Sequence, residues 1–311
     1  MGAMLSVSEL RKSYEIRRTP FSVRKETIRA VDRISFDLEQ GQTLGLVGES
    51  GCGKSTVAKC ITMLEKPDEG RILFMGRDWV NMAEKERKGL RKEMQIIFQD
   101  PFSSLNPRKR VLDTIAEPLK VHRMVEKGSL SEKVLEVLKS VGLDEDFLKK
   151  YPHEMSGGQR QRVAIGRALA TAPSFIVADE PVSSLDVSVQ AQIINLFLDI
   201  RERLRISMLF ISHDLNIVRF ISDRTMVMYR GKVVETGETE ELFSHPLHPY
   251  TRLLMLASND KEGELEGQGA ASNHGCVFLD GCSEKKEMCA DDSPMLKGPS
   301  SHRVACFLYP E

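Results

Sequence analysis

A glycine-rich loop in the first quarter of the chain constrains the fold more than any other stretch. A short apolar run, Leu44 to Val47, precedes the loop, and a segment with helical apolar spacing, Val57 to Leu64, follows it. In this arrangement of strand, loop and helix, backbone amides wrap a nucleoside triphosphate, a lysine reaches the outer phosphates and a serine ligates magnesium. We therefore predict an α/β fold that binds ATP or GTP through Gly48, Glu49, Ser50, Gly51, Cys52, Gly53, Lys54, Ser55 and Thr56.

The composition sets limits on partners and location. The chain has 311 residues, 41% hydrophobic and 29% charged, which suffices for one large core or two domains. Its formal net charge is -1, so no overall field favours nucleic acid or an anionic membrane. No apolar run approaches the roughly 20 residues that span a bilayer, and the N-terminal residues lack a secretory pattern. We expect a cytosolic chain that binds no nucleic acid.

Short strands are predicted up to the loop, over Leu5 to Leu10, Ala30 to Leu38 and Thr43 to Val47. Such a run indicates an antiparallel β layer beside a parallel core. Tyr14, just after the first of these strands, is a candidate for stacking on an adenine ring. The alternative is an ordinary half-buried aromatic residue at a strand end.

Two carboxylates end another predicted strand, Phe175 to Glu180. An acidic residue at this place holds magnesium through water in phosphate-loop ATPases, and we assign that part to Asp179. Glu180 follows it and is the candidate general base for water that attacks the γ-phosphate. A pair of acidic residues that merely caps the next helix is the alternative.

Polar residues also end two further strands. Gln99 follows the strand predicted over Met94 to Phe98, and His213 follows the strand predicted over Ser207 to Ile211. In open α/β sheets, groups at the carboxyl ends of the strands face the ligand. We expect Gln99 to contact magnesium or the attacking water and His213 to lie near the same site.

The spacing turns helical between Val111 and Tyr151, which predicts a helical insertion with breaks at Pro118 and Gly142. A second turn suited to an anion then opens a helix that runs from Arg160 to Ala170. By itself such a turn more often starts a helix than binds a ligand. Its residues are Ser156, Gly157, Gly158 and Gln159.

In this order, the motifs resemble those of the ATPase subunits of ABC transporters across about residues 4–257. The resemblance implies a P-loop core with an antiparallel β subdomain and an inserted α-helical subdomain over about residues 100–170. It also implies a head-to-tail dimer in which the turn at Ser156 completes the ATP site at Lys54 of the other subunit. Asp186 belongs to the loop after Glu180, and His213 senses the γ-phosphate. Met155 stands where the family usually has leucine.

Three further segments resemble the ATPases of oligopeptide and dipeptide importers: Gln99 to Arg108, Ala116 to Leu119 and His245 to Thr251. This narrower resemblance implies ATP hydrolysis that powers peptide import, on the cytoplasmic face of the membrane as a peripheral subunit. The implied partners are two permeases, a second ATPase that is a paralogue or another copy, and indirectly an extracytoplasmic solute-binding protein. A soluble ATPase of a phosphonate-degrading complex is the alternative.

We predict an ATPase domain over residues 1–257. A linker over residues 258–275 and a cysteine-containing extension over residues 276–311 follow it. Clustered cysteines in a cytosolic chain favour metal over disulfides. The resemblance extends to importer ATPases of which some hold a 4Fe-4S cluster, while zinc, disulfides or free thiols stay open. The sequence departs from the family around the second cysteine, where Gly281 and Ser283 flank it. The four residues are Cys276, Cys282, Cys289 and Cys306.

Overall fold

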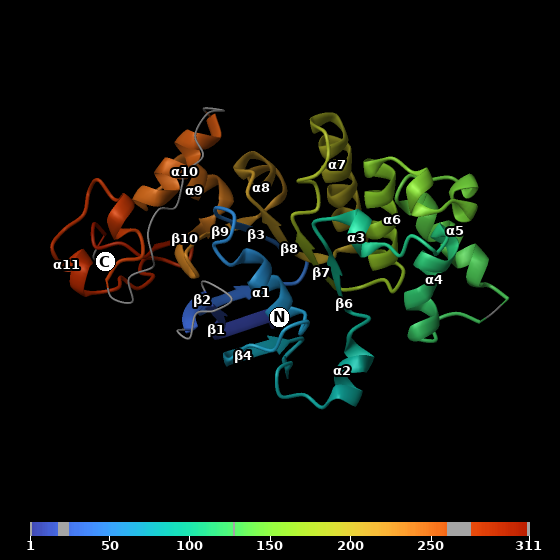
Figure 1. Ribbon diagram of the computed structural model, residues 1–311, viewed down its shortest axis with the longest axis horizontal. Coiled ribbons are helices and arrows are strands. Elements are labelled where there is room, and N and C mark those ends of the chain that lie inside the picture. Colours follow the sequence, from blue (N-terminus) through green and yellow to red (C-terminus); the bar gives the residue numbers. More distant parts are fainter. Residues whose placement is uncertain (1, 18–24, 127, 260–274, 310–311) are drawn as a thin grey trace. The chain divides into compact units, whose positions relative to one another are not determined.

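The computed structural model describes residues 2–17, 25–126, 128–259 and 275–309, drawn as a ribbon in Figure 1. The chain divides into two compact units. The first comprises Met1–Leu38, Thr43–Val80 and Phe210–Glu311, and the second comprises Glu39–Gln42 and Asn81–Leu209. The predicted linker lies almost entirely in residues 260–274, outside the described residues.

An antiparallel sheet of the order β2-β1-β4-β5 opens the first unit, which confirms the predicted antiparallel layer. Its first strand is longer than predicted, so Tyr14 lies inside the strand and opposite Ile28 rather than beyond its end. Register shifts between Val7 and Ser13 break the alternation of apolar and polar residues, which hid the second half of the strand. The strands are β1 (Leu5–Arg17), β2 (Lys25–Leu38), β4 (Glu69–Phe74) and β5 (Arg77–Asp78).

This unit also holds four strands of a mixed sheet, which are neighbours in the order β11-β10-β9-β3. Strands β3 and β9 run parallel, whereas β10 is antiparallel to both β9 and β11. All five residues of β3 are buried, as expected for a strand of a covered parallel sheet. The strands are β3 (Thr43–Val47), β9 (Arg224–Tyr229), β10 (Lys232–Glu238) and β11 (His302–Val304).

The helices of the first unit are short. The 3-10 turn η3 (Leu279–Gly281) belongs to the C-terminal segment. The α-helices are α1 (Lys54–Ile61), α8 (Leu215–Ile221), α9 (Thr239–Ser244), α10 (Pro249–Asn259) and α11 (Met288–Asp291). The indole Nε1 of Trp79, a fully buried side chain, donates to the carbonyl of Ile61 at 2.9 Å and so fixes the end of α1.

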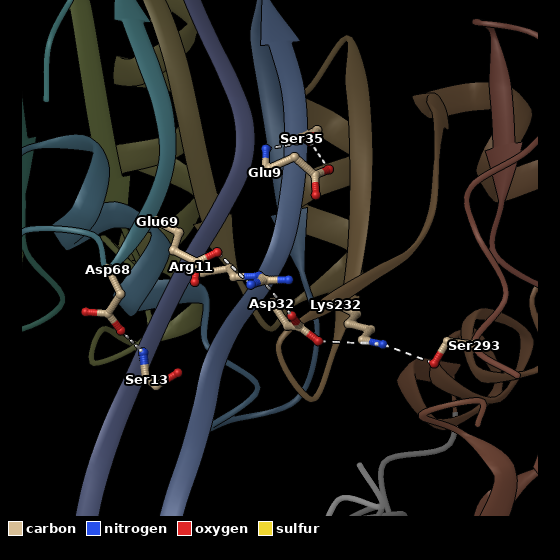
Figure 2. Close-up of polar contacts among 9 residues, drawn as sticks. All are labelled: Glu9, Arg11, Ser13, Asp32, Ser35, Asp68, Glu69, Lys232 and Ser293. Carbon is tan, nitrogen blue, oxygen red and sulfur yellow. Dashed lines mark hydrogen bonds and ion pairs between the residues drawn. The ribbon is translucent and has the colours of Figure 1, made fainter. Parts of the chain in front are cut away.

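Two of the contacts that attach the C-terminal segment to this unit lie on β10. β11 pairs with β10, and Lys232 Nζ on β10 donates to Ser293 Oγ at 3.3 Å. Lys232 Nζ also lies 3.6 Å from the Asp32 carboxylate, which pairs in turn with Arg11 on β1 at 3.7 Å. Figure 2 shows these side chains together. Arg11 bonds Glu69 on β4 at 2.6 Å. A continuous series of polar contacts therefore runs from the antiparallel sheet to the C-terminal segment.

The second unit contains two parallel neighbouring strands, β6 (Met94–Ile97) and β7 (Phe175–Asp179). Helices α4, α5 and α6 lie side by side (Figure 1), and a Cβ added to Gly166 of α6 would lie 3.5 Å from Ile115 and 3.6 Å from Val137. The 3-10 turns are η1 (Glu145–Lys149) and η2 (Pro152–Glu154). The α-helices are α2 (Glu84–Leu90), α3 (Pro101–Ser104), α4 (Val111–Val121), α5 (Leu130–Ser140), α6 (Gly157–Leu169) and α7 (Val187–Leu204).

The predicted helix breaks are half right. Gly142, with φ of +73°, follows the end of α5 as a helix-ending glycine does. Pro118 instead lies inside α4, which continues to Val121. The prediction failed because α4 buries Ile115 and Leu119 on either side of the proline, and packing of this kind stabilises a helix against one missing hydrogen bond.

Strand β8 (Ser207–Ser212) crosses the boundary between the units, with Ser207–Leu209 in the second and Phe210–Ser212 in the first. Across the described ranges, every helix is too short or too polar to cross a membrane.

Candidate nucleotide-binding site

The glycine-rich loop leads directly into α1, as predicted. The helix begins at Lys54 and its N-cap is Gly53, in a left-handed conformation with φ of 111°. Because glycine has no side chain to cap the helix, the first amides of α1 are offered to an anion. The Lys54 ammonium is buried and donates to the carbonyls of Gly48 at 2.7 Å and Glu49 at 2.9 Å. The lysine therefore lies against the loop that it is predicted to serve.

Two glycines of the loop are required by close packing. A Cβ on Gly53 would lie 2.0 Å from the carbonyl oxygen of Ala30 in β2, and one on Gly48 would lie 2.1 Å from that of Met228 in β9. The amide of Gly231 also donates to the carbonyl of Cys52 at 2.9 Å. Neighbouring backbone thus holds the loop in shape, and a larger residue at either glycine would displace it.

Gln99 and Glu180 lie in contact within the second unit. The Gln99 amide Nε2 donates to Glu180 Oε2 at 2.9 Å. Glu180 is buried, as is Asp179 at the end of β7, and Glu180 has a φ of +46°. A left-handed conformation is uncommon for a residue with a side chain. The structure therefore brings together two of the residues predicted to act on water.

The turn at Ser156 forms a capping box at the start of α6. The amide of Gln159 donates to Ser156 Oγ at 3.3 Å, and the amide of Ser156 donates to Gln159 Oε1 at 3.0 Å. A Cβ on Gly158 would lie 2.5 Å from a methyl carbon of Val189 in α7. Helix initiation and packing therefore account for these residue types within one chain. Ser156 is exposed, so the turn is accessible.

Asp186 caps α7 in the same way. Its carboxylate accepts from the Val189 amide at 3.0 Å and from the Ser188 hydroxyl at 2.7 Å. The hydroxyl bond from Ser188, followed by the amide bond, lowers the pKa of Asp186. The carboxylate is exposed and charged at neutral pH.

His213 is an exposed residue in the first unit, between β8 and α8. Its neighbour Asp214 caps α8 by accepting from the amides of Asn216 at 2.9 Å and Ile217 at 3.2 Å. The histidine therefore lies at the carboxyl end of a strand, where it was predicted.

Tyr14 is half-buried, and its hydroxyl donates to the Glu65 carboxylate. Burial, together with this bond, raises the pKa of Tyr14 to about 12. Lys12 Nζ lies 5.7 Å from the centre of the ring. These contacts agree with the alternative, an ordinary half-buried aromatic residue of a strand. Stacking of Tyr14 on adenine stays a prediction.

The residues assigned to magnesium have suitable chemistry. Ser55 offers a hydroxyl, Asp179 a carboxylate and Gln99 an amide oxygen, all hard oxygen ligands of the kind that Mg²⁺ takes. The bond from Gln99 to Glu180 uses the amide nitrogen and leaves the amide oxygen for a cation. The set fits the ion.

Sequence reasoning missed two residues outside these motifs. The amide of Glu49, in the phosphate loop, donates to the hydroxyl of Tyr250 at 3.1 Å. Glu235 in β10 is fully buried and accepts from the amides of Leu247 at 2.8 Å and His248 at 2.9 Å. Both interactions involve the segment from His245 to Thr251, which had been noted only as a family pattern.

The four C-terminal cysteines line one pocket, together with Phe278 and His248. All four are free thiols, and burial raises the pKa of Cys276 and of Cys306. Four thiols are a suitable donor set for an iron–sulfur cluster or for zinc. Yet within the ranges that the structure describes, no three cysteine, histidine or acidic residues are placed so that they could hold a metal ion. The arrangement therefore does not support the predicted 4Fe-4S cluster.

A phosphate loop before α1, an acidic end on β7 and antiparallel and mixed sheets define a P-loop ATPase of the ABC class. Residues 31–183 match the ABC transporter family, and residues 234–289 match the family described as the C-terminal region of oligopeptide/dipeptide transporters. The chain belongs to the ATP-binding subunits of ABC transporters, in the oligopeptide and dipeptide transport group.

Similarity to curated relatives extends over nearly the whole chain. The oligopeptide transport ATP-binding protein AppF of Bacillus subtilis is 46% identical, with 98% of this chain and 97% of the relative covered. The dipeptide transport ATP-binding protein DppF of Escherichia coli is 40% identical, with 98% and 94% covered. These matches favour a transporter subunit over the phosphonate-complex alternative.

Solved structures confirm the P-loop α/β fold of an ABC ATPase. cbiO1 of Clostridium perfringens, part of the ABC transporter complex cbiONQ, has a TM-score of 0.67 at 28% identity, with 79% of this chain and 92% of that chain covered. A dimeric ATP-binding cassette bound to ADP and phosphate also has a TM-score of 0.67 at 28% identity, with 76% and 99% covered.

Proposed function

We propose that this chain hydrolyses ATP to power the import of di- or oligopeptides by an ABC transporter. The single observation that carries hydrolysis is the contact of the Gln99 amide with the buried carboxylate of Glu180. Peptide as the cargo is supported by the names of the relatives and by the match of residues 234–289 to the transporter C-terminal region.

The residues act as follows in this proposal. The amides from Gly48 to Thr56 bind the phosphates of ATP, Lys54 neutralises their charge, and Tyr14 stacks on the adenine. Glu180 takes a proton from the attacking water, while Gln99 orients the carboxylate and His213 contacts the γ-phosphate. Ser55, Gln99 and Asp179 would hold Mg²⁺, which would supply positive charge against the phosphates.

A head-to-tail dimer completes the site. The turn of Ser156, Gly157, Gly158 and Gln159, in which Ser156 is exposed, lies at a helix N-terminus, where amides and the helix dipole favour an anion. We place this turn, in trans, on the ATP of the opposite subunit, with Asp186 at the dimer contact. The second subunit is a paralogue or another copy, and a related cassette has been solved as a dimer.

The domain organisation follows the same scheme. Residues 1–257 form the ATPase, with a helical subdomain over about residues 100–170 that includes α4, α5 and α6. A linker, residues 258–275, leads to the extension of residues 276–311. The subunit binds two permeases peripherally on the cytoplasmic face, and a solute-binding protein on the other side delivers the peptide.

For the extension we keep the 4Fe-4S cluster predicted from the sequence as a proposal, although the described residues form no metal site there; its ligands would be four cysteines that line one pocket, Cys276, Cys282, Cys289 and Cys306. The thiols would have to come closer together than in the structure to do so. Iron and zinc analysis of protein purified anaerobically tests the proposal. Iron and labile sulfide near four per chain are expected, while zinc or free thiols alone would contradict it.

Membrane isolation tests the transport function. The chain, tagged in its native cells, is expected to come out of detergent-solubilised membranes with two permeases, and vesicles holding the complex should hydrolyse ATP faster when the binding protein and a peptide are added. Recovery with soluble enzymes alone, or a rate indifferent to peptide, would contradict it.

A further inference from the structure

A buried tyrosine outside the ATP-binding motifs touches the phosphate loop. Tyr250, near the start of α10, is fully buried, and its hydroxyl accepts the amide hydrogen of Glu49 at 3.1 Å. Glu49 is the second residue of the loop, directly after Gly48. Burial raises the pKa of the Tyr250 phenol, so the hydroxyl stays protonated and accepts through a lone pair. The bond fixes the point where the loop leaves β3.

The Tyr250 ring is positioned by other aromatic rings rather than by the loop. Its centre lies 4.5 Å from that of Tyr229, the last residue of β9. It also lies 5.5 Å from the ring of Phe278, which stands edge-on to Tyr229 at 5.3 Å. Three rings in mutual contact at tilted or edge angles form a stiff group, because each restricts the rotation of the others.

Phe278 connects this group to the cysteine pocket. It lies between Cys276 and Cys282 in the sequence, is buried, and lines the pocket that all four cysteines share. The amide of Leu279 donates to the carbonyl of Cys276 at 3.1 Å, and that of Gly281 donates to the carbonyl of Phe278 at 3.2 Å. A rearrangement of either cysteine therefore moves the Phe278 backbone and ring.

We propose that Tyr250 is a positioning residue for the phosphate loop, and that Phe278 makes this positioning depend on the packing of the cysteine-bearing segment from Cys276 to Cys282. A change at the cysteine pocket then alters the affinity for ATP without contact between the pocket and the nucleotide. The inference rests on the proposed binding of ATP to the loop.

The test is the affinity of the full chain for ATP. Tyr250→Phe keeps the ring and removes the hydroxyl, so we expect the Kd for a fluorescent ATP analogue to rise about 2- to 10-fold, the ratio that one hydrogen bond of ordinary net strength gives. The kcat for ATP hydrolysis should change by less than about twofold, because the bond holds the loop and not the reacting groups.

Tyr229→Phe is the matched control. It removes a hydroxyl from the same ring group, but Tyr229 contacts Tyr250 and Phe278 through its ring. We expect it to bind the analogue as the parent does. An unchanged Kd for Tyr250→Phe, or an equal rise for both variants, would overturn the positioning role. Binding is measured well below the melting temperature of each variant, so a loss of stability alone does not change the result.

A double-mutant cycle tests the part played by Phe278. Phe278→Leu should weaken binding in the parent but add nothing to Tyr250→Phe, since it acts through the missing hydroxyl. Full additivity, or parent affinity in Phe278→Leu, would overturn the dependence on the cysteine segment. If the parent itself bound no ATP, the proposed function would fail, which separates that outcome from failure of this inference.

Discussion

Gln99 Nε2 donates to Oε2 of Glu180 at 2.9 Å, which joins the residues that follow two neighbouring parallel strands. Gln99 comes after β6 and Glu180 comes after β7, so the contact follows from the sheet itself. It fixes the position of the Glu180 carboxylate, the group that is proposed to accept a proton from water. Because of this bond, a movement of the residues that follow Gln99 would also shift the Glu180 carboxylate.

Gln99→Ala removes this bond. We expect ATP hydrolysis to fall about 10- to 100-fold, the ratio given by loss of a hydrogen bond to a charged group. Gln95→Ala is the matched control, since Gln95 Nε2 donates to the carbonyl of Arg91 and not to Glu180. Phosphate release by the two variants is compared with that of the parent. Equal rates for Gln99→Ala and the parent would show that Gln99 does not orient the base.

Ser156 separates helix capping from anion binding. Aspartate caps helices as well as serine does, while alanine loses about 1 kcal/mol. We expect Ser156→Asp to unfold in urea as the parent does but to lose ATP hydrolysis, because its charge repels the γ-phosphate of the opposite subunit. Ser156→Ala should lose stability. Parent-level hydrolysis by Ser156→Asp would mean that the turn is only a helix start.

Burial of the His248 imidazole makes the stability of the fold depend on pH. Burial lowers the pKa of His248 from 6.5 to about 4, against a smaller opposing effect of Glu235. The unfolded chain therefore binds a proton as the pH falls through 6.5, while the folded chain does not until about pH 4. Stability is lost on acidification between these values, by at most about 3 kcal/mol at 1.36 kcal/mol per pKa unit.

His248→Asn tests this dependence. The Asn oxygen replaces Nδ1, which accepts from the Tyr250 amide at 3.1 Å, but it does not titrate. Between pH 7.5 and 5 the variant should lose less free energy of unfolding than the parent, by up to about 2 kcal/mol. Carboxylates affect both proteins alike, so the difference is the readout. Equal losses would exclude His248 as the source.

The sequence was informative where chemistry and local geometry coincide. Gly53, Lys54 and the end of β7 lie as predicted. The residue patterns of a phosphate loop and of an acidic strand end are specific, because few other local structures require them. Gln99 and Glu180 lie together because adjacent parallel strands bring their carboxyl ends to one edge.

The rest depended on packing between residues far apart in sequence. Pro118 lies within α4 because buried neighbours stabilise the helix around it. The bond of Tyr250 to Glu49 spans 201 positions, and Glu235 is satisfied by partners 12 to 67 positions away. A pattern of neighbouring residues in the sequence does not predict contacts between such distant positions. The clustered cysteines predicted a metal site; the structure places all four in one pocket, but no three of the described cysteine, histidine or acidic residues are placed to hold a metal ion.

The most direct test of ATP-driven function is phosphate release by Glu180→Gln beside the parent, with ATP retention and dimer mass measured on the same samples. We predict at least about a 100-fold slower release, as loss of a general base gives. The variant should keep ATP bound and run as a dimer. Hydrolysis by Glu180→Gln at the parent's rate would contradict the assignment of the base and with it the account of the site.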